Sequence, residues 1–261
     1  MRIAIYQADA FASRRFAGNP AAVMPLESWL PDELLQAIAA ENNLSETAFF
    51  VREGDAWRLR WFTPAVEVDL CGHATLATAL VMRDRLGLWT GRVAFETRSG
   101  TLEVSEEEGR LVLDFPAQVP AACAAPPGLE AALGAAPAET LRMIDLVCVF
   151  GDAAAIRALQ PDFKALATID ARGVVVTAPG DPGDCDFVSR FFAPRGGIDE
   201  DPVTGSAHCK LIPYWSRRLG RQRLFARQVS RRGGELWCED RGARVRIAGH
   251  GVIYLDGSVE I

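Results

Sequence analysis

Lysine is almost absent from this chain: Lys164 and Lys210 are the only two lysines among its 261 residues. An enzyme that binds its substrate or pyridoxal phosphate as a Schiff base would have to use one of these two side chains. The composition therefore disfavours Schiff-base chemistry.

Long apolar runs and paired cysteines are also missing. No stretch reaches the ~18 apolar residues of a membrane span, and the apolar start at Met1–Tyr6 is too short for a signal peptide. The cysteines are scattered, without a CxxC pair, at Cys71, Cys123, Cys148, Cys185, Cys209 and Cys238. A chain of this length needs no disulfides. We therefore expect a soluble, cytoplasmic protein with reduced thiols.

Positive charge is the third deficit. The net charge is −6 and the sequence pI is about 5.2, and no basic stripe is interleaved with aromatic residues. The arginines clustered between Arg217 and Arg232 are interpreted as a solvated helix end and strand face. Neither nucleic acid nor a membrane is an expected partner.

Two similar turns are the most informative feature that is present. Asp69–Thr75 (DLCGHAT) precedes a helix predicted over Ala74–Leu86, and Asp201–Cys209 (DPVTGSAHC) precedes one predicted over Leu211–Leu219. The start of a helix offers unpaired backbone N–H groups and the positive end of the helix dipole. The pattern predicts two similar halves that meet at one anion-binding cleft.

Strand-like segments surround each turn, so the order of strands, glycine turn, helix and strands occurs twice. A helix is also predicted to begin at Pro31 and to stop at Asn42 and Asn43. Predicted strands are Arg2–Tyr6, Glu46–Val51, Trp57–Phe62, Arg92–Thr97, Gly100–Val104, Arg110–Phe115, Leu146–Phe150, Gly173–Ala178, Phe187–Phe192, Arg227–Arg231, Glu235–Glu239 and Ala243–Ala248. The Ala- and Pro-rich stretch Pro116–Pro137 indicates a domain connection. We predict domains at 1–116 and 117–250, with 251–261 completing the first.

Glu46 is the first candidate for chemistry. It begins an apolar strand on which Ala48 and Phe50 share its face. One interpretation is an ordinary solvated glutamate at the end of a strand. The other is a desolvated carboxylate whose pKa is raised, so that it can take and return a proton.

His73 and Asp201 have two interpretations each. His73 is either a surface or capping residue, or a neutral imidazole that donates to a substrate oxygen, with its pKa lowered by the helix N-terminus. Asp201 either caps the second helix or faces the cleft and shares a proton with the substrate or with His73.

Cysteine and histidine occur together in both turns, which raises two further hypotheses. Cys71, His73, His208 and Cys209 could supply four ligands to zinc. Consecutive helical residues point about 100° apart, however, so His208 and Cys209 are poorly placed for one ion. Cys71 and His73 could instead form a nucleophile and its base, although residues two apart in a turn rarely align. Both hypotheses are disfavoured, and no metal is expected.

Four motifs in this order resemble one family over essentially the whole chain. They are Phe16–Pro20 (FAGNP), Asn43–Thr47 (NLSET), Asp69–Thr75 (DLCGHAT) and Glu200–Ser206 (EDPVTGS). Together they are similar to the PhzF-like isomerases of phenazine biosynthesis, within the diaminopimelate-epimerase-like fold. The resemblance implies an α+β fold of two similar domains, each with a curved, barrel-like, mostly antiparallel sheet around a central helix. It also implies a homodimer.

The resemblance implies a role for each matching position. Glu46 would be the general acid and base, Asp201 its acidic partner and His73 the polar group that faces the substrate. A substrate carboxylate would be held at the helix starts by Gly72 with His73 and by Gly205 with Ser206, which needs no lysine or arginine. The accessory candidates beside the motifs are Cys71, Asn19 and His208.

The predicted function is that of a cofactor-independent isomerase, which shifts a proton and a double bond in a small unsaturated carboxylate. Related racemases use two thiols, but the turn at Asp201–Gly205 has no cysteine, so two-thiol racemisation is disfavoured. Two alternatives remain open. One is an epimerase that uses the single thiol of Cys71 together with Glu46, and the other is a catalytically silent carboxylate-binding protein.

Overall fold

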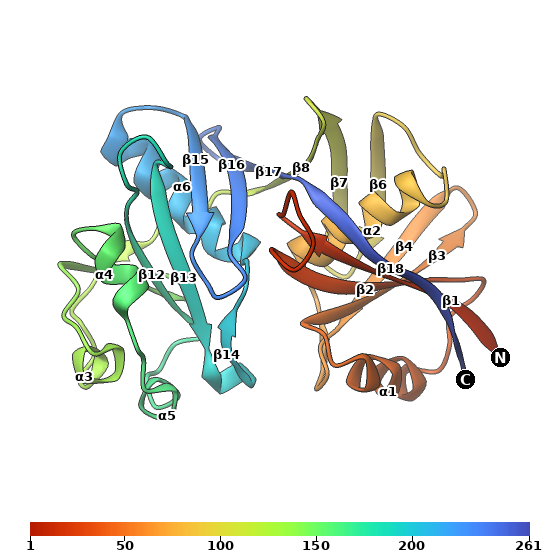
Figure 1. Ribbon diagram of the computed structural model, residues 1–261, viewed down its shortest axis with the longest axis horizontal. Helices are drawn as coiled ribbons and strands as arrows, with labels where there is room; N and C mark the ends of the chain where they lie inside the picture. The colour runs from red at the N-terminus through yellow and green to blue at the C-terminus, as the bar shows by residue number, and fades with distance from the viewer. The chain divides into compact units, whose positions relative to one another are not determined.

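The computed structural model describes all residues 1–261, and the chain forms two compact units (Figure 1). Unit 1 contains Met1–Asp114 together with Ala248–Ile261, and unit 2 contains Phe115–Ile247. In each unit a sheet packs with a small number of helices. The α+β class predicted from the sequence is therefore confirmed.

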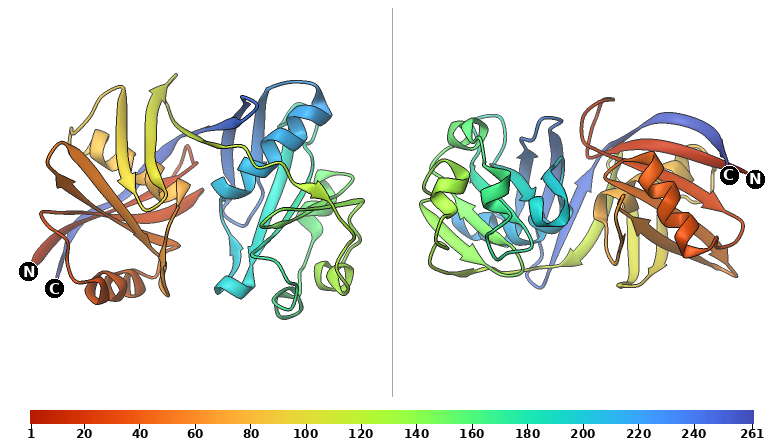
Figure 2. Two further views of the ribbon diagram at one scale, coloured as in Figure 1. Left: turned by 180° about the vertical axis from the view of Figure 1, so that it is seen from behind. Right: turned by 90° about the horizontal axis from the view of Figure 1, so that it is seen from below.

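The sheet of unit 1 is mostly antiparallel. Strand β1 pairs antiparallel with both β18 and β2. The pairs β3–β4, β4–β5 and β6–β7 are also antiparallel, whereas β2–β3 and β4–β6 are parallel. The first and last strands of the chain thus lie side by side (Figures 1 and 2). The strands are β1 (Arg2–Ala10), β2 (Asn19–Leu26), β3 (Glu46–Glu53), β4 (Ala56–Phe62), β5 (Glu67–Val68), β6 (Arg92–Thr97), β7 (Gly100–Glu107), β8 (Arg110–Pro116) and β18 (Gly251–Glu260).

Helix α2 (Gly72–Asp84) is the central helix of unit 1. All ten residues from His73 to Met82 are buried, and the helix contacts β1, β2, β3 and β18. A helix that is apolar on all sides is stable only inside a core. It begins two residues before the predicted start, because the extended backbone of Cys71 caps it and Gly72 is already helical.

Helix α1 (Asp32–Asn42) follows Pro31, as the sequence predicts. It stops because Asn43 adopts a left-handed conformation with φ of 48°, from which its N–H bonds to the carbonyl of Ala39. Asparagine tolerates this conformation better than most residues. Leu35, Ile38 and Ala39 form the buried face of this helix.

Unit 2 contains nine strands and the second central helix. The strands are β9 (Ala121–Ala122), β10 (Glu139–Arg142), β11 (Leu146–Val149), β12 (Val174–Pro179), β13 (Phe187–Ala193), β14 (Ile198–Asp201), β15 (Arg223–Gln228), β16 (Gly234–Asp240) and β17 (Arg244–Gly249). The helices are α3 (Leu129–Leu133), α4 (Ala153–Ala158), α5 (Phe163–Leu166), the 3₁₀ turn η1 (Pro194–Gly196) and α6 (Gly205–Leu219).

Two predictions about unit 2 are wrong in their boundaries. The strand predicted at Arg227–Arg231 is β15, which begins at Arg223 because its inward residues, Leu224 and Ala226, precede the arginine-rich end. Helix α6 begins at Gly205 and not near Leu211, because Thr204 has the extended backbone of a cap residue. The short helices α3, α4 and α5 were not predicted.

The two units repeat one pattern of strand pairing. In unit 1 the successive pairings are antiparallel for β1–β2, parallel for β2–β3, antiparallel for β3–β4 and β4–β5, parallel for β4–β6, and antiparallel for β6–β7. In unit 2 the pairs β10–β11, β11–β12, β12–β13, β13–β14, β13–β15 and β15–β16 follow the same series. Helix α2 follows β5, and α6 follows β14. The predicted internal repeat is therefore confirmed by topology.

Candidate functional site

Glu46 and His73, two of the predicted site residues, are in contact in unit 1. Glu46 is the first residue of β3, and His73 is the second residue of α2. Glu46 Oε2 lies 3.0 Å from His73 Nε2, with the two side chains 13% and 6% exposed. The two atoms are not aligned as a hydrogen bond, so the contact is an attraction between a carboxylate and the imidazole edge.

The other nitrogen of His73 faces two of the accessory candidates. Nδ1 lies 3.2 Å from Asn19 Nδ2 and 3.4 Å from Cys71 Sγ. Because the amide nitrogen of Asn19 is a donor, the neutral ring carries its hydrogen on Nε2, which is the nitrogen beside Glu46. Unit 1 thus brings Asn19, Glu46, Cys71 and His73 together around one ring.

Asn19 reaches the ring because of the backbone just before it. Gly18 adopts φ of 68°, a conformation that favours glycine. A Cβ atom at this position would lie 2.1 Å from the carbonyl oxygen of Ala10. The glycine of the FAGNP motif is therefore required for the path of the chain into β2.

The electrostatics of His73 differ from the sequence prediction. Burial by itself lowers the pKa of His73, but the interactions of the ring with Cys71 and with Glu46 outweigh it, so the pKa is raised well above the ordinary value. The predicted lowering of this pKa by the helix N-terminus is therefore wrong. A carboxylate oxygen 3.0 Å away acts more strongly than the partial charge of a helix end.

The thiol of Cys71 is protected from ionisation. Burial raises the pKa of Cys71, and the neighbouring Glu46 carboxylate raises it further, whereas His73 lowers it. Only 6% of Cys71 is exposed. A nucleophilic cysteine normally has a lowered pKa and an accessible sulfur.

Glu46, Cys71 and His73 could each offer a ligand atom to a metal, and these atoms lie within 4.8 Å of one another. The carboxylate approaches Nε2 of the ring, however, and the sulfur approaches Nδ1. The three side chains are thus close enough to share one ion, although the close contacts of the ring are made through different nitrogens.

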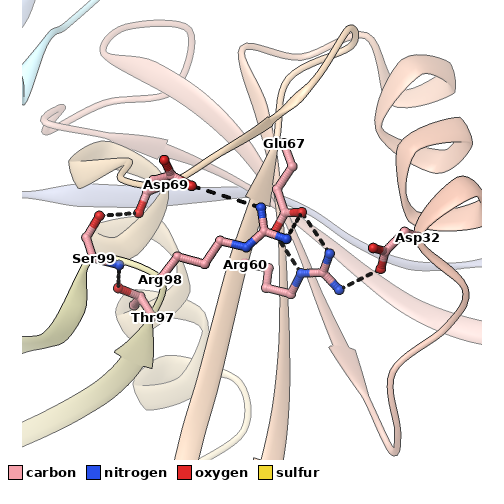
Figure 3. Close-up of polar contacts among 7 residues, drawn as sticks. All are labelled: Asp32, Arg60, Glu67, Asp69, Thr97, Arg98 and Ser99. Carbon is pink, nitrogen blue, oxygen red and sulfur yellow. Dashed lines mark hydrogen bonds and ion pairs between the residues drawn. The ribbon is translucent and has the colours of Figure 1, made fainter.

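A chain of ion pairs anchors the segment that leads into α2 (Figure 3). Glu67, on β5 and 12% exposed, accepts two hydrogen bonds from Arg60, at 2.7 and 2.8 Å, and pairs with Arg98 at 2.7 Å. Arg60 also reaches Asp32 at 2.9 Å. The hydroxyl of Ser99 donates to the carbonyl of Asp69 at 2.7 Å. These contacts fix β5 and Asp69, the residues that lead into α2, and so position the start of the helix.

Asp201 ends β14 in unit 2 and is tied to the turn before α6. The Thr204 hydroxyl donates to its carboxylate. Gln228 donates from Nε2 to the Asp201 carbonyl at 2.7 Å and accepts the Thr204 N–H on Oε1 at 2.9 Å. Asp201 is not the cap of α6, because Thr204 occupies that position. The sequence pattern missed Gln228, whose only local signal is a polar residue at an inward position of β15.

His208 lies within the core of unit 2. Its Nδ1 lies 2.8 Å from the carbonyl oxygen of Thr204, and its ring lies 5.9 Å from that of Phe187. Burial lowers the pKa of His208 to about 4, so the ring is neutral at neutral pH and donates from Nδ1. This accessory candidate therefore packs under the first turn of α6.

Gly205 and Ser206 are the first two residues of α6, and charged side chains that the sequence analysis did not consider surround Ser206. Arg172 Nη2 donates to the Ser206 hydroxyl oxygen at 3.2 Å, and Lys210 Nζ donates to its carbonyl at 2.9 Å. Both cations also contact the buried carboxylate of Asp145. Two cationic side chains thus lie beside the start of α6.

The comparisons with known proteins agree with this architecture. A family model described as phenazine biosynthesis-like protein matches residues 8–257. A Pseudomonas aeruginosa protein named as an uncharacterized isomerase is 56% identical over 262 residues, which is 100% of each chain. The crystal structure of a PhzF-family protein from Enterococcus faecalis has a TM-score of 0.97 and 48% identity, and covers 100% of both chains.

A more distant structure shows how far the fold extends. The hydroxyproline epimerase of Agrobacterium vitis has a TM-score of 0.59 at 12% identity, covering 99% of this chain and 92% of that one. This similarity concerns the fold alone. The predicted epimerase-like fold is confirmed. No helix of the chain has the length and apolar character needed to cross a membrane.

Proposed function

The chain belongs to the family of phenazine biosynthesis-like proteins, and from this premise we propose that Glu46 shuttles a proton within a small unsaturated carboxylate. Relatives that cover the whole chain are named isomerases, and the chain is an enzyme of this isomerase or epimerase type. The observation that carries the proposal is the contact between the largely buried Glu46 carboxylate and His73.

The proposed reaction needs no oxidant or reductant. The Glu46 carboxylate removes a proton from a carbon acidified by a neighbouring double bond, so that a C–H bond breaks and an O–H bond forms. The electron pair moves across the double bond to a second carbon. Glu46 then returns the same proton to that carbon, on the same face, and the carboxylate is regenerated. The product differs from the substrate only in the position of the double bond and of the proton.

His73 supports this role through its position. Its Nε2 lies 3.0 Å from the Glu46 carboxylate, and the raised pKa of His73 shows that the surroundings favour the positive ring. A positive or strongly polarised ring stabilises the carboxylate before proton removal and the anionic character that develops on the substrate afterwards. The ring is held in one orientation by Asn19 and Cys71 on its other nitrogen.

We propose that the substrate carboxylate is held by the backbone N–H groups at the helix starts, Gly72 with His73 and Gly205 with Ser206. The first N–H groups of a helix have no partner within the helix, and they point along its axis towards an anion. In this proposal Asp201 acts as the acidic partner, and its carboxylate is oriented by the Thr204 hydroxyl.

An epimerase that uses the thiol of Cys71 is the second candidate, but the local geometry favours Glu46 alone. The thiol is buried, its pKa is raised, and it contacts the nitrogen of His73 opposite to the one beside Glu46. A single carboxylate that serves two carbons on one face fits these observations better than a pair of groups on two faces.

The experiment is proton exchange in D₂O, followed by NMR, with cyclic dienyl, amino and hydroxy carboxylates as test compounds. Glu46→Gln keeps the shape of the side chain but cannot accept a proton at neutral pH. We expect it to lower exchange by about 10²- to 10⁴-fold, with unchanged folding and carboxylate binding. Glu53→Gln is the matched control, since Glu53 lies on the same strand with an exposed side chain.

Three outcomes separate the candidates. Exchange that depends on Glu46 and moves a double bond supports the isomerase. Deuterium at a stereocentre without a moved double bond, lost in Cys71→Ala, supports the epimerase. Full activity of Glu46→Gln overturns the role of Glu46, and saturable binding without exchange on any compound indicates a binding protein.

A further inference from the structure

The internal repeat gives Ser206 and His73 equivalent positions. Each is the second residue of the central helix of its unit, directly after the glycine of the turn. The repeat also makes β3 equivalent to β12, since each pairs in parallel with the strand before it. In unit 1 the side chain that meets this helical residue comes from Glu46, at the start of β3. In unit 2 it comes from Arg172, two residues before β12.

Arg172 reaches Ser206 because a buried carboxylate holds its guanidinium. Asp145 precedes β11 directly, and the parallel pairing of β11 with β12 brings Asp145 beside Arg172. Nε of Arg172 bonds to Oδ1 of Asp145 at 2.7 Å, and Nη2 bonds to Oδ2 at 2.6 Å. This two-pronged contact fixes the plane of the guanidinium.

The cluster carries one positive charge in excess. Lys210 Nζ lies 2.8 Å from the same carboxylate, and both the Lys210 and Asp145 side chains are fully buried. Two cations therefore share one anion. Asp145 and Lys210 are closed off from solvent, whereas the side chain of Arg172 is 45% exposed. The excess charge is consequently presented at the guanidinium.

The hydrogen-bond donors of this surface are not all used. Within the chain, Arg172 bonds through Nε and Nη2, and its Nη1 amino group forms no hydrogen bond or ion pair. The Ser206 hydroxyl oxygen accepts from Arg172, since a guanidinium can only donate. The hydroxyl hydrogen of Ser206 has no acceptor within the chain. Arg172 and Ser206 thus offer adjacent donors to one external anion.

We propose that Arg172 is a substrate-recognition residue of unit 2, and that it selects carboxylates with a second carboxylate group over simple monocarboxylates. Backbone N–H groups are sufficient to bind one carboxylate, whereas a guanidinium with a spare amino group and an uncompensated charge suits a further one. This inference rests on the proposed function for the place of Ser206 in carboxylate binding. It concerns which carboxylate is bound, and not how the proton moves.

The test compares maleate, a dicarboxylate, with crotonate, a monocarboxylate of similar length, by titration calorimetry. We expect the wild-type protein to bind maleate about 10- to 100-fold more tightly, the range of a charge-assisted pair. Arg172→Gln should abolish this preference. Arg172→Lys, which keeps the positive charge but not the bidentate geometry of the guanidinium, should retain part of it. Arg157→Gln is the matched control, because Arg157 is a half-exposed arginine of the same unit that pairs with Asp181.

The proposal is overturned if the ratio of the maleate affinity to the crotonate affinity is the same in the wild type and in Arg172→Gln. An equal fall in Arg157→Gln also overturns it, because the effect would then come from overall charge. Thermal unfolding of each variant checks its fold, and Arg172→Met, which also removes the charge, replaces Arg172→Gln if that variant is unfolded.

Binding and exchange fail separately, so the two proposals can be told apart. In Glu46→Gln the maleate preference should remain while exchange is lost. If exchange depends on Glu46 but the ratio of maleate to crotonate affinity does not change in Arg172→Gln, only the recognition role is wrong. If the ratio depends on Arg172 but no compound exchanges, the isomerase proposal is wrong and the recognition role stands.

Discussion

Cys71 and Glu46 contact opposite nitrogens of one imidazole ring, that of His73. The sulfur lies 3.4 Å from Nδ1, and the carboxylate oxygen lies 3.0 Å from Nε2. The two groups therefore meet the ring at different nitrogens, although the sulfur and a carboxylate oxygen lie within 4.8 Å of each other. This relationship decides what the thiol can contribute.

Cys71→Ala should keep at least about a third of the wild-type proton exchange. The thiol is buried with a raised pKa and contacts Nδ1 of His73, so its loss removes a packing contact and no ionised nucleophile. The measurement is deuterium uptake by NMR beside the wild type. A fall as large as that of Glu46→Gln would contradict this prediction and favour the thiol epimerase. Alkylation mapping offers a second check, since Cys71 should react more slowly than the partly exposed Cys123.

Unit 2 should lose stability in acid because of His208. The pKa of this buried ring is lowered to about 4, against about 6.5 in an unfolded chain. Between these two values the unfolded state binds a proton that the folded state does not, so stability falls as the pH falls from 7 to 4. The contribution is about 3 kcal/mol over this range.

The measurement for His208 is the free energy of unfolding in urea at pH 7, 5.5 and 4. His208→Asn cannot titrate but still offers a side-chain donor to the Thr204 carbonyl. We expect its loss of stability between pH 7 and pH 4 to be about 3 kcal/mol smaller than that of the wild type. Identical pH dependence in the two proteins would show that His208 does not cause the acid sensitivity.

Gly18→Ala should destabilise unit 1 by about 2 kcal/mol or more and lower proton exchange. The added Cβ would meet the carbonyl of Ala10 at 2.1 Å, and φ of 68° is unfavourable for alanine. The backbone would have to move, and Asn19 would move with it away from His73. Gly54→Ala is the control, since its φ of 61° is similar but its Cβ would enter open space. Gly54→Ala should lower the free energy of unfolding by only about 1 kcal/mol and should leave proton exchange unchanged. Equal effects of the two substitutions would contradict the role given to the close approach of Gly18 to Ala10.

Glu67→Gln should destabilise unit 1 by about 1–3 kcal/mol. Glu67 accepts hydrogen bonds from Arg60 and forms an ion pair with Arg98, and the Arg60 side chain is only 18% exposed, so the substitution leaves a largely buried cation with weaker compensation. Denaturant unfolding measures the effect. Glu103→Gln is the control, because it breaks a surface pair with Arg92 at 3.4 Å and should change stability by less than about 0.5 kcal/mol. A comparable small effect for Glu67→Gln would show that the network in Figure 3 does not hold the turn.

Local sequence signals predicted the elements well where they are strong. Asn43 ends α1 through its left-handed backbone, and the glycine turns at Gly72 and Gly205 mark the starts of the two central helices. These features depend on neighbouring residues alone, because capping and turn conformations are decided within a few positions. Boundaries were missed where the cap was a residue such as Cys71 or Thr204, whose side chain makes no capping bond.

The candidate site was predictable only in part. Glu46 and His73 were selected from their motifs, and the structure places them in contact. The raised pKa of His73 was not predictable, because it depends on the burial of the ring and on its contacts with Cys71 and with Glu46, which lies on a strand distant in the chain. Gln228 was missed for the same reason, because its role depends on three hydrogen bonds to Asp201 and Thr204, which lie far from it in the chain.

The amino-acid sequence by itself determined the two central helices and α1, the turns, the repeat of one pattern and the residue types available for chemistry. Only the tertiary structure decided that Asp145, Arg172 and Lys210 form one charged cluster around Ser206. The physical reason is the parallel pairing of β11 with β12, which aligns their starts, so that Asp145 and Arg172 meet and reach Lys210 and Ser206 of α6. Such pairing joins distant segments through backbone hydrogen bonds, which leave no local pattern in the side chains.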